Sequence, residues 1–164
     1  MKRGYEAYFT QIYEGLKAMT CDVVFMCEHD VLYHPSHFDF TPVLKDKFYY
    51  NHNWWKYRLK DGFCAHWEAN QVSGLCAYRE LLLEFYKNRL EEVKKDRYHY
   101  GMGFEPGKSG DKTVVWNSLY PNVDIRHGDN LTGDKWSMAD FRDKSTGQGF
   151  VTAWEIPGWG KIKI

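Results

Sequence analysis

The segment Cys21–Asp30 reads C-D-V-V-F-M-C-E-H-D, a short apolar run that stops at two carboxylates flanking a histidine. The apolar residues 23–26 are too few to cross a membrane and include β-branched and aromatic side chains, which is typical of a buried strand in a parallel sheet. We therefore predict a strand whose carboxyl end carries Glu28, His29 and Asp30. Ligands of open α/β sheets bind at that end of the strands. Two acidic side chains placed there suit a divalent cation.

The residues before this strand predict an amphipathic helix over about 4–19. Apolar side chains recur at helical spacing on one stripe, while the charged ones fall largely elsewhere. The stripe consists of Tyr5, Tyr8, Phe9, Ile12, Tyr13, Leu16 and Met19. A helix that leads into a buried strand is half of a crossover unit.

The remainder of the chain predicts more strands, one more helix and several loops. Pro35 suits the first turn of a short helix, and the dipeptide at 61–62, Asp-Gly, is typical of a tight hairpin. We expect antiparallel strands at 48–51, 54–59 and 63–67, a strand at 71–78, a helix at 79–95, a mobile glycine-rich loop at 100–112, and short strands at 114–116 and 123–125. The tail beyond 126 has little periodicity.

Composition limits the classes of protein to which the chain can belong. Its 164 residues predict a single globular domain, and the 22 basic and 22 acidic residues balance, so no attraction to nucleic acid is indicated. No apolar run is long enough for a membrane span or a signal peptide, so we expect a cytoplasmic protein. The four cysteines show no C-x-x-C spacing and are expected to be reduced.

The helix followed by D-V-V-F-M-C-E-H-D-V-L-Y-H-P-S-H-F, residues 22–38, resembles the segment of GT-A-fold, family-2-like glycosyltransferases that ends in the D-x-D metal motif. Here the motif would be E-x-D. The segments G-F-E-P-G (103–107) and P-N-V-D-I-R-H-G (121–128) extend the resemblance to about residues 5–136. It implies an α/β fold with part of a GT-A mixed sheet flanked by helices, and an antiparallel hairpin region. No counterpart of the family's nucleotide-binding half precedes Met1, so the chain is expected to be the metal and acceptor half.

The resemblance also implies a function and a metal site. The chain would transfer a sugar from a nucleotide-sugar donor to an unknown hydroxyl acceptor. Glu28 and Asp30 would hold Mn²⁺ or Mg²⁺ against the donor diphosphate, because both ions prefer oxygen ligands. His127 would complete the metal shell, although a histidine after a short strand is also a common surface residue.

Two further residues have both a functional and a structural interpretation. Arg126 could bind phosphate oxygens through its planar guanidinium, or form a structural salt bridge. Glu105 could be the general base that deprotonates the acceptor hydroxyl, or a solvated loop carboxylate.

Two alternatives compete with the transferase interpretation. The first is a truncated, non-catalytic glycosyltransferase remnant that acts as a binding or oligomerisation module, for instance as a homodimer formed through an exposed sheet edge. The second is a zinc cluster, although the ligand spacing matches no standard zinc finger. Its ligands would be Cys27, His29, His34 and His37.

Overall fold

The computed structural model describes residues 4–66, 68–95, 105–107, 111–127 and 152–162. These residues form a mixed α/β protein with two helices and two mixed sheets, and they divide into two compact units. Unit 1 comprises 1–26, 41–50 and 70–115, and unit 2 comprises 27–40, 51–69 and 116–164. The prediction of an α/β fold is confirmed, whereas the GT-A assignment and the single domain stay predictions.

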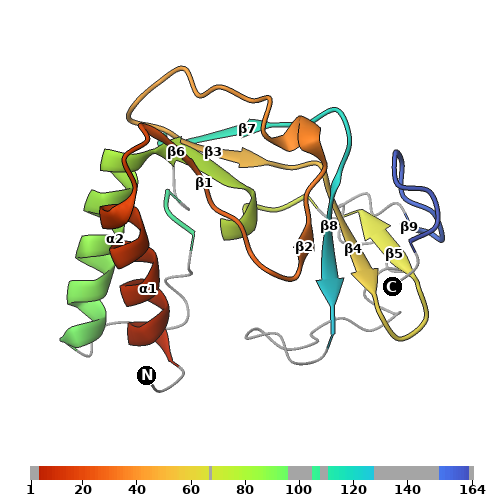
Figure 1. Cartoon of the computed structure of the whole chain (residues 1–164), viewed down its shortest axis with the longest axis horizontal. Helices are drawn as coiled ribbons and strands as arrows, with labels where there is room; N and C mark the ends of the chain where they lie inside the picture. Colours follow the sequence, from red (N-terminus) through yellow and green to blue (C-terminus); the bar gives the residue numbers. More distant parts are fainter. Residues whose placement is uncertain (1–3, 67, 96–104, 108–110, 128–151, 163–164) are drawn as a thin grey trace. The chain divides into compact units, whose positions relative to one another are not determined.

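Unit 1 contains both helices and most of a sheet that we call sheet A. Among the described residues, sheet A has four strands in the order β1-β6-β3-β7. The strands are β1 (Val23–Phe25), β6 (Leu75–Tyr78), β3 (Phe48–Asn51) and β7 (Thr113–Trp116), and the helices are α1 (Tyr5–Ala18) and α2 (Arg79–Lys94). α1 and α2 lie side by side (Figure 1).

The predicted strand at 23–26 is present as β1, but its predicted parallel pairing is wrong. β1 pairs antiparallel with β6, and Val24 lies opposite Ala77. Apolar side chains indicate that a strand is buried, but they do not fix the direction of its neighbour. Parallel pairing occurs instead between β3 and β7, because Phe48 N–H donates to the Lys112 carbonyl and His52 N–H to the Trp116 carbonyl, so both strands advance in the same direction.

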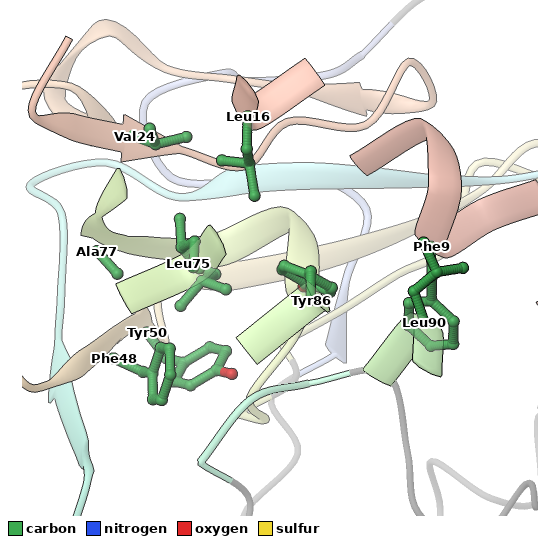
Figure 2. Close-up of a cluster of buried hydrophobic side chains, with 10 residues drawn as sticks. Phe9, Leu16, Val24, Phe48, Tyr50, Leu75, Ala77, Tyr86 and Leu90 are labelled. Atoms are coloured by element: carbon green, nitrogen blue, oxygen red, sulfur yellow. The ribbon is translucent and has the colours of Figure 1, made fainter. Parts of the chain in front are cut away.

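The core of unit 1 lies between the two helices and sheet A (Figure 2). Phe9 and Leu16 of α1 are fully or almost fully buried, which confirms the amphipathic stripe predicted for this helix. Tyr86 of α2 has no exposed surface, and its ring lies 6.2 Å from that of Phe9. The sheet contributes Val24, Phe48, Tyr50, Leu75 and Ala77.

Unit 2 contains a second sheet, sheet B, with the order β2-β8-β4-β5-β9 among the described residues. Its strands are β2 (Val31–Leu32), β8 (Asn122–Arg126), β4 (Trp54–Arg58), β5 (Cys64–His66) and β9 (Thr152–Ala153). β4 and β8 run parallel over five residue pairs, while the other pairs are antiparallel. The carboxyl ends of β4 and β8 therefore lie at the same end of sheet B, where the strands stop.

Side chains alternate between the two faces of β4 and β8, as the strand period of two requires. Trp55, Tyr57 and Val123 are buried in the core of unit 2, on one face of the sheet. Lys56 and Asp124 are register partners and belong to the opposite face. Sheet B therefore has an apolar face and a face that carries charge.

Local turn residues in unit 2 behave as the sequence predicts. β4 and β5 form an antiparallel hairpin, and Gly62 in its turn has a φ of 75°, a left-handed conformation that favours glycine. Pro35 is the first residue of a short 3₁₀ helix, η1 (Pro35–His37). β3, which we predicted next to this hairpin, belongs to sheet A instead.

The remaining predictions have mixed outcomes. The strand predicted at 71–78 begins as the 3₁₀ turn η2 (Val72–Gly74) and becomes β6 only at Leu75. Most of the loop at 100–112 and residues 128–151 of the tail lie outside the described residues. The four cysteines are free, as expected. None of the helices described is both long enough and apolar enough to cross a bilayer, and the predicted compartment stays a prediction.

Candidate metal site

The antiparallel pairing of β2 with β8 brings together two chain segments that are far apart in the sequence. Asp30 directly precedes β2, and its carbonyl accepts a hydrogen bond from the Ile125 N–H at 2.8 Å. His127 directly follows β8. As a result, His127 Nε2 lies 3.7 Å from Asp30 Oδ2, at the end of sheet B where β8 stops.

His29 joins these two residues to form a cluster that we call the His–Asp–His cluster. One ligand atom from each of His29, Asp30 and His127 can be chosen so that all three lie within 4.8 Å of one another. His29 is exposed, while the side chains of Asp30 and His127 retain 17% and 30% of their exposure. Asp30 and His127 thus flank paired strands of sheet B, His29 lies in the turn before β2, and all three donors remain accessible to solvent.

The separation and chemistry of these donors fit a divalent metal ion. Two atoms that bind one ion at about 2.1 Å are at most about 4.2 Å apart, so the cluster needs to contract only slightly. One carboxylate suits either ion predicted from the sequence, whereas imidazole nitrogen is a poor ligand for Mg²⁺. Of the two predicted ions, the donor set therefore favours Mn²⁺, and it would also accept Zn²⁺.

Two of the three predicted metal ligands, Asp30 and His127, belong to the cluster, whereas Glu28 does not. Glu28 is exposed, and its N–H donates to the Tyr33 hydroxyl at 3.0 Å. Our prediction assumed that the chain stays extended through 28–30, which would place Glu28 and Asp30 on one side. In the structure a turn at 29–30 places His29 beside Asp30 instead. The role of Glu28 as a ligand stays a prediction.

Charged residues of β4 and β8 surround the carboxylate of Asp124. Asp124 is buried, and Arg126 Nη1 lies 3.4 Å from each of its carboxylate oxygens. Burial raises the pKa of Asp124, against the positive charges of Arg126 and Lys56, and the negative charge of Asp30 adds to the rise. Burial also lowers the pKa of Lys56 to about 8. Arg126 thus forms the salt bridge that was one of its two interpretations, and its phosphate contact stays a prediction.

Glu105, the predicted base, belongs to unit 1. It precedes Pro106, whose carbonyl accepts a hydrogen bond from the Tyr50 hydroxyl at 2.6 Å. Burial raises the pKa of Tyr50, and the charge of Glu105 contributes to that rise, so the carboxylate lies near this hydroxyl. The catalytic role of Glu105 stays a prediction.

The alternative zinc cluster is not assembled in the part of the chain that the structure describes. The metal-competent group found there combines His29 with Asp30 and His127, and not with the other proposed zinc ligands. His34 Nδ1 is 2.9 Å from the Ser36 hydroxyl, and His37 is fully buried against two asparagine amides. These two histidines shape the turn at Pro35 and the interior of unit 2.

Comparison of the chain with protein-family models, curated protein sequences and solved structures finds no match. The case for a function therefore depends on the geometry of the His–Asp–His cluster and on the sequence motifs.

Proposed function

We propose that this chain is a metal-dependent glycosyltransferase-like domain, which transfers a sugar from a nucleotide-sugar donor to a hydroxyl acceptor. The observation that carries the proposal is the His–Asp–His cluster, whose ligand atoms converge within 4.8 Å at the end of β8. Asp30 and His127 were predicted as metal ligands from motifs almost a hundred residues apart, and they lie 3.7 Å from each other. Such convergence is what a shared ligand requires.

In this proposal the cluster holds Mn²⁺ beside the diphosphate of the donor. A bound divalent ion neutralises the negative charge that develops on the departing nucleoside diphosphate. Asp30 supplies a hard oxygen ligand, and the two imidazoles fix the position of the ion. Asp30 and His127 directly flank the paired strands β2 and β8, which limits how far these two ligands can move apart.

The positive charges of Lys56 and Arg126 support the same role. Both belong to the charged face of sheet B, next to Asp124, whose pKa is sensitive to Asp30. A guanidinium suits phosphate oxygens because its N–H groups can form two parallel charge-assisted hydrogen bonds. In the proposed reaction Glu105 accepts the proton of the acceptor hydroxyl, a role that comes from the family resemblance alone.

The test is metal-dependent binding of nucleotide, measured by titration calorimetry with UDP and GDP in the presence and absence of Mn²⁺. We expect saturable binding that requires Mn²⁺ and falls at least about 100-fold in Asp30→Ala, because removing a metal ligand should cost no less than removing its supporting residues. Asp39→Ala is the matched control, because Asp39 is an exposed acid of the same unit. It should bind as the wild type does.

Two outcomes would overturn the proposal. Binding of Mn²⁺ without any nucleotide would indicate a non-catalytic metal-binding remnant. Copurified zinc that is lost in His127→Ala, with no exchange for Mn²⁺, would indicate a zinc site instead. In both cases metal analysis of the purified protein identifies the ion directly.

A further inference from the structure

A cavity of about 330 Å³ opens beside the β4–β5 hairpin in unit 2. It is lined by the end of β4, by the hairpin turn and by the segment after β9. Its lining includes Leu59, Lys60, Asp61, Trp154 and Lys161. A volume of this size lies at the lower end of the range for small-molecule sites.

The cavity lies at the same end of sheet B as the His–Asp–His cluster, where β4 and β8 stop. Leu59, which lines the cavity, follows β4, and its N–H donates to the Arg126 carbonyl at 3.2 Å. His127 is the next residue after Arg126. Since β4 and β8 are neighbouring parallel strands, spaced about 4.8 Å apart, the strand ends that carry the cavity and the cluster are adjacent.

Trp154 gives the cavity a large aromatic surface. Its side chain is 58% exposed, and it is the most exposed of the tryptophans that the structure describes. The ring is not loose, because it packs edge-on against Phe63 with the centroids 5.6 Å apart. The Arg58 guanidinium covers Phe63 at 5.2 Å and is held by Asp61 through two hydrogen bonds. Leu59, which lines the same cavity, is 45% exposed, so two large apolar side chains are exposed at one cavity with polar residues around them, as at ligand-binding grooves.

The groups around Trp154 match a sugar ring in particular. A pyranose has two apolar C–H faces, which pack on an aromatic plane, and a perimeter of hydroxyl groups. Lys60 and Lys161 can donate hydrogen bonds to oxygens on that perimeter, and the Asp61 carboxylate can accept them. A purely apolar ligand would make no use of the two lysine ammonium groups or of the carboxylate oxygens that stand around the ring.

We propose that the cavity beside Trp154 is a saccharide-binding subsite and that it receives the acceptor sugar. The identification as the acceptor site rests on the proposed function, whereas binding of a saccharide does not. In this arrangement Trp154 stacks on one face of the ring, Lys60 and Lys161 donate to its hydroxyl or carboxylate oxygens, and Asp61 accepts from its hydroxyl groups. A glycan, and not a peptide or a lipid, is then the molecule to which sugar is transferred.

Saturation-transfer NMR on the full chain tests the subsite without metal or nucleotide. The probes are lactose, cellobiose, maltose, chitobiose and glucuronic acid, each at up to tens of millimolar. We expect at least one probe to receive saturation, and the transfer to be lost in Trp154→Ala and partly kept in Trp154→Phe. Leu119→Ala is the matched control, because Leu119 is 78% exposed and lies in the same unit but does not line the cavity. Circular dichroism confirms that each variant is folded.

The design separates failure of the subsite from failure of the proposed function. If nucleotide binds with Mn²⁺ but no probe shows transfer that depends on Trp154, the subsite is overturned and the proposed function stands. If a probe binds through Trp154 but no nucleotide binds, the subsite stands and the transferase is overturned. If UMP or GMP alone, and no saccharide, gives transfer that depends on Trp154, the cavity binds a nucleobase and the subsite proposal is wrong.

Discussion

The described residues of unit 2 include two clusters built around histidine, and they differ in how their side chains are held. In the first, which we call the His37 network, His37, Asn51 and Asn122 are fully buried and joined by hydrogen bonds of 3.0 Å. In the second, the His–Asp–His cluster, His127 Nε2 and Asp30 Oδ2 are 3.7 Å apart, which is longer than a hydrogen bond. The first cluster binds its own side chains together, and the second holds side chains near one another at the surface. Buried polar groups that are satisfied internally stabilise a fold, whereas converging donors open to solvent can serve a ligand.

The hydrogen bonds of the His37 network also define its protonation state. Asn51 Oδ1 accepts from the N–H groups of Asn53 and Ser118, and Asn122 Oδ1 accepts from the His34 N–H. Both amide NH₂ groups must therefore face His37 Nδ1, which has to be the acceptor. His37 is consequently neutral, with its ring proton on Nε2.

The largest expected effect comes from breaking this network with Asn51→Ala. The substitution removes hydrogen bonds to His37, to the Ser118 hydroxyl and to two backbone N–H groups, and it leaves those groups buried. We expect the free energy of unfolding, measured by urea denaturation, to fall by about 3–5 kcal/mol.

His29→Ala is the matched change in the other cluster, because His29 is exposed. It should alter the free energy of unfolding by less than about 0.5 kcal/mol. Equal losses in the two variants would contradict the division into a structural and a ligand-binding cluster.

A smaller change in the free energy of unfolding is expected when the pH is lowered and the sequence is kept. Burial lowers the pKa of His37 from the ordinary value of 6.5 to about 4. Between these values the unfolded chain binds more protons than the folded one, so stability rises with pH. The contribution of His37 is complete above pH 6.5 and is lost as the pH falls toward 4, to a total of about 3 kcal/mol.

Denaturation curves between pH 5 and 6.5 measure this slope, because ordinary carboxylates remain mostly ionised there. Asp124 acts with the opposite sign, because burial raises its pKa. His66, whose pKa is lowered by burial, acts in the same direction as His37. A flat profile, or stability that decreases with pH in this window, would show that His37 is not buried as a neutral ring.

The comparison also explains which features the sequence could predict. Periodicity located α1, α2, β4 and β8, because burial of one face imposes a repeat of 3.6 or 2 residues. Asp30 was found because it follows a predicted strand, at the end where ligands bind, whereas His127 was predicted from the family resemblance. The antiparallel direction of β1 and the separate sheets of β3 and β4 were missed, because pairing partners depend on contacts between distant segments.

His29 and His37 show the same limit for single residues. The turn at 29–30 contains no glycine or proline, so no local pattern indicated that His29 would take the place of Glu28 as the partner of Asp30. His37 was considered as a zinc ligand because its imidazole is a common zinc ligand. Its actual partners, Asn51 and Asn122, lie 14 and 85 residues away and could not be recognised from the sequence. Neither asparagine has a local pattern that points to a histidine.

The smallest expected effect is the change in the free energy of unfolding when Asp30 of the His–Asp–His cluster is replaced. The sign of this change is more informative than its size. In metal-free protein at pH 8, Asp30→Asn should leave the free energy of unfolding unchanged or raise it by up to about 0.5 kcal/mol. The negative charge of Asp30 disfavours the ionised form of the buried Asp124, and Asp30→Asn removes that repulsion. Urea denaturation in EDTA measures the difference.

If the cluster is a metal site, adding Mn²⁺ makes the wild type more stable than Asp30→Asn. The wild type should gain about 2.7 kcal/mol at a concentration one hundred times the dissociation constant, whereas Asp30→Asn should gain far less. A loss of more than about 1 kcal/mol for Asp30→Asn in EDTA would mean that Asp30 stabilises the fold, like the His37 network. In a metal site, a ligand such as Asp30 destabilises the metal-free protein and stabilises it only when the ion is bound. A residue of a structural cluster stabilises the protein in both conditions, so this difference distinguishes the two kinds of cluster.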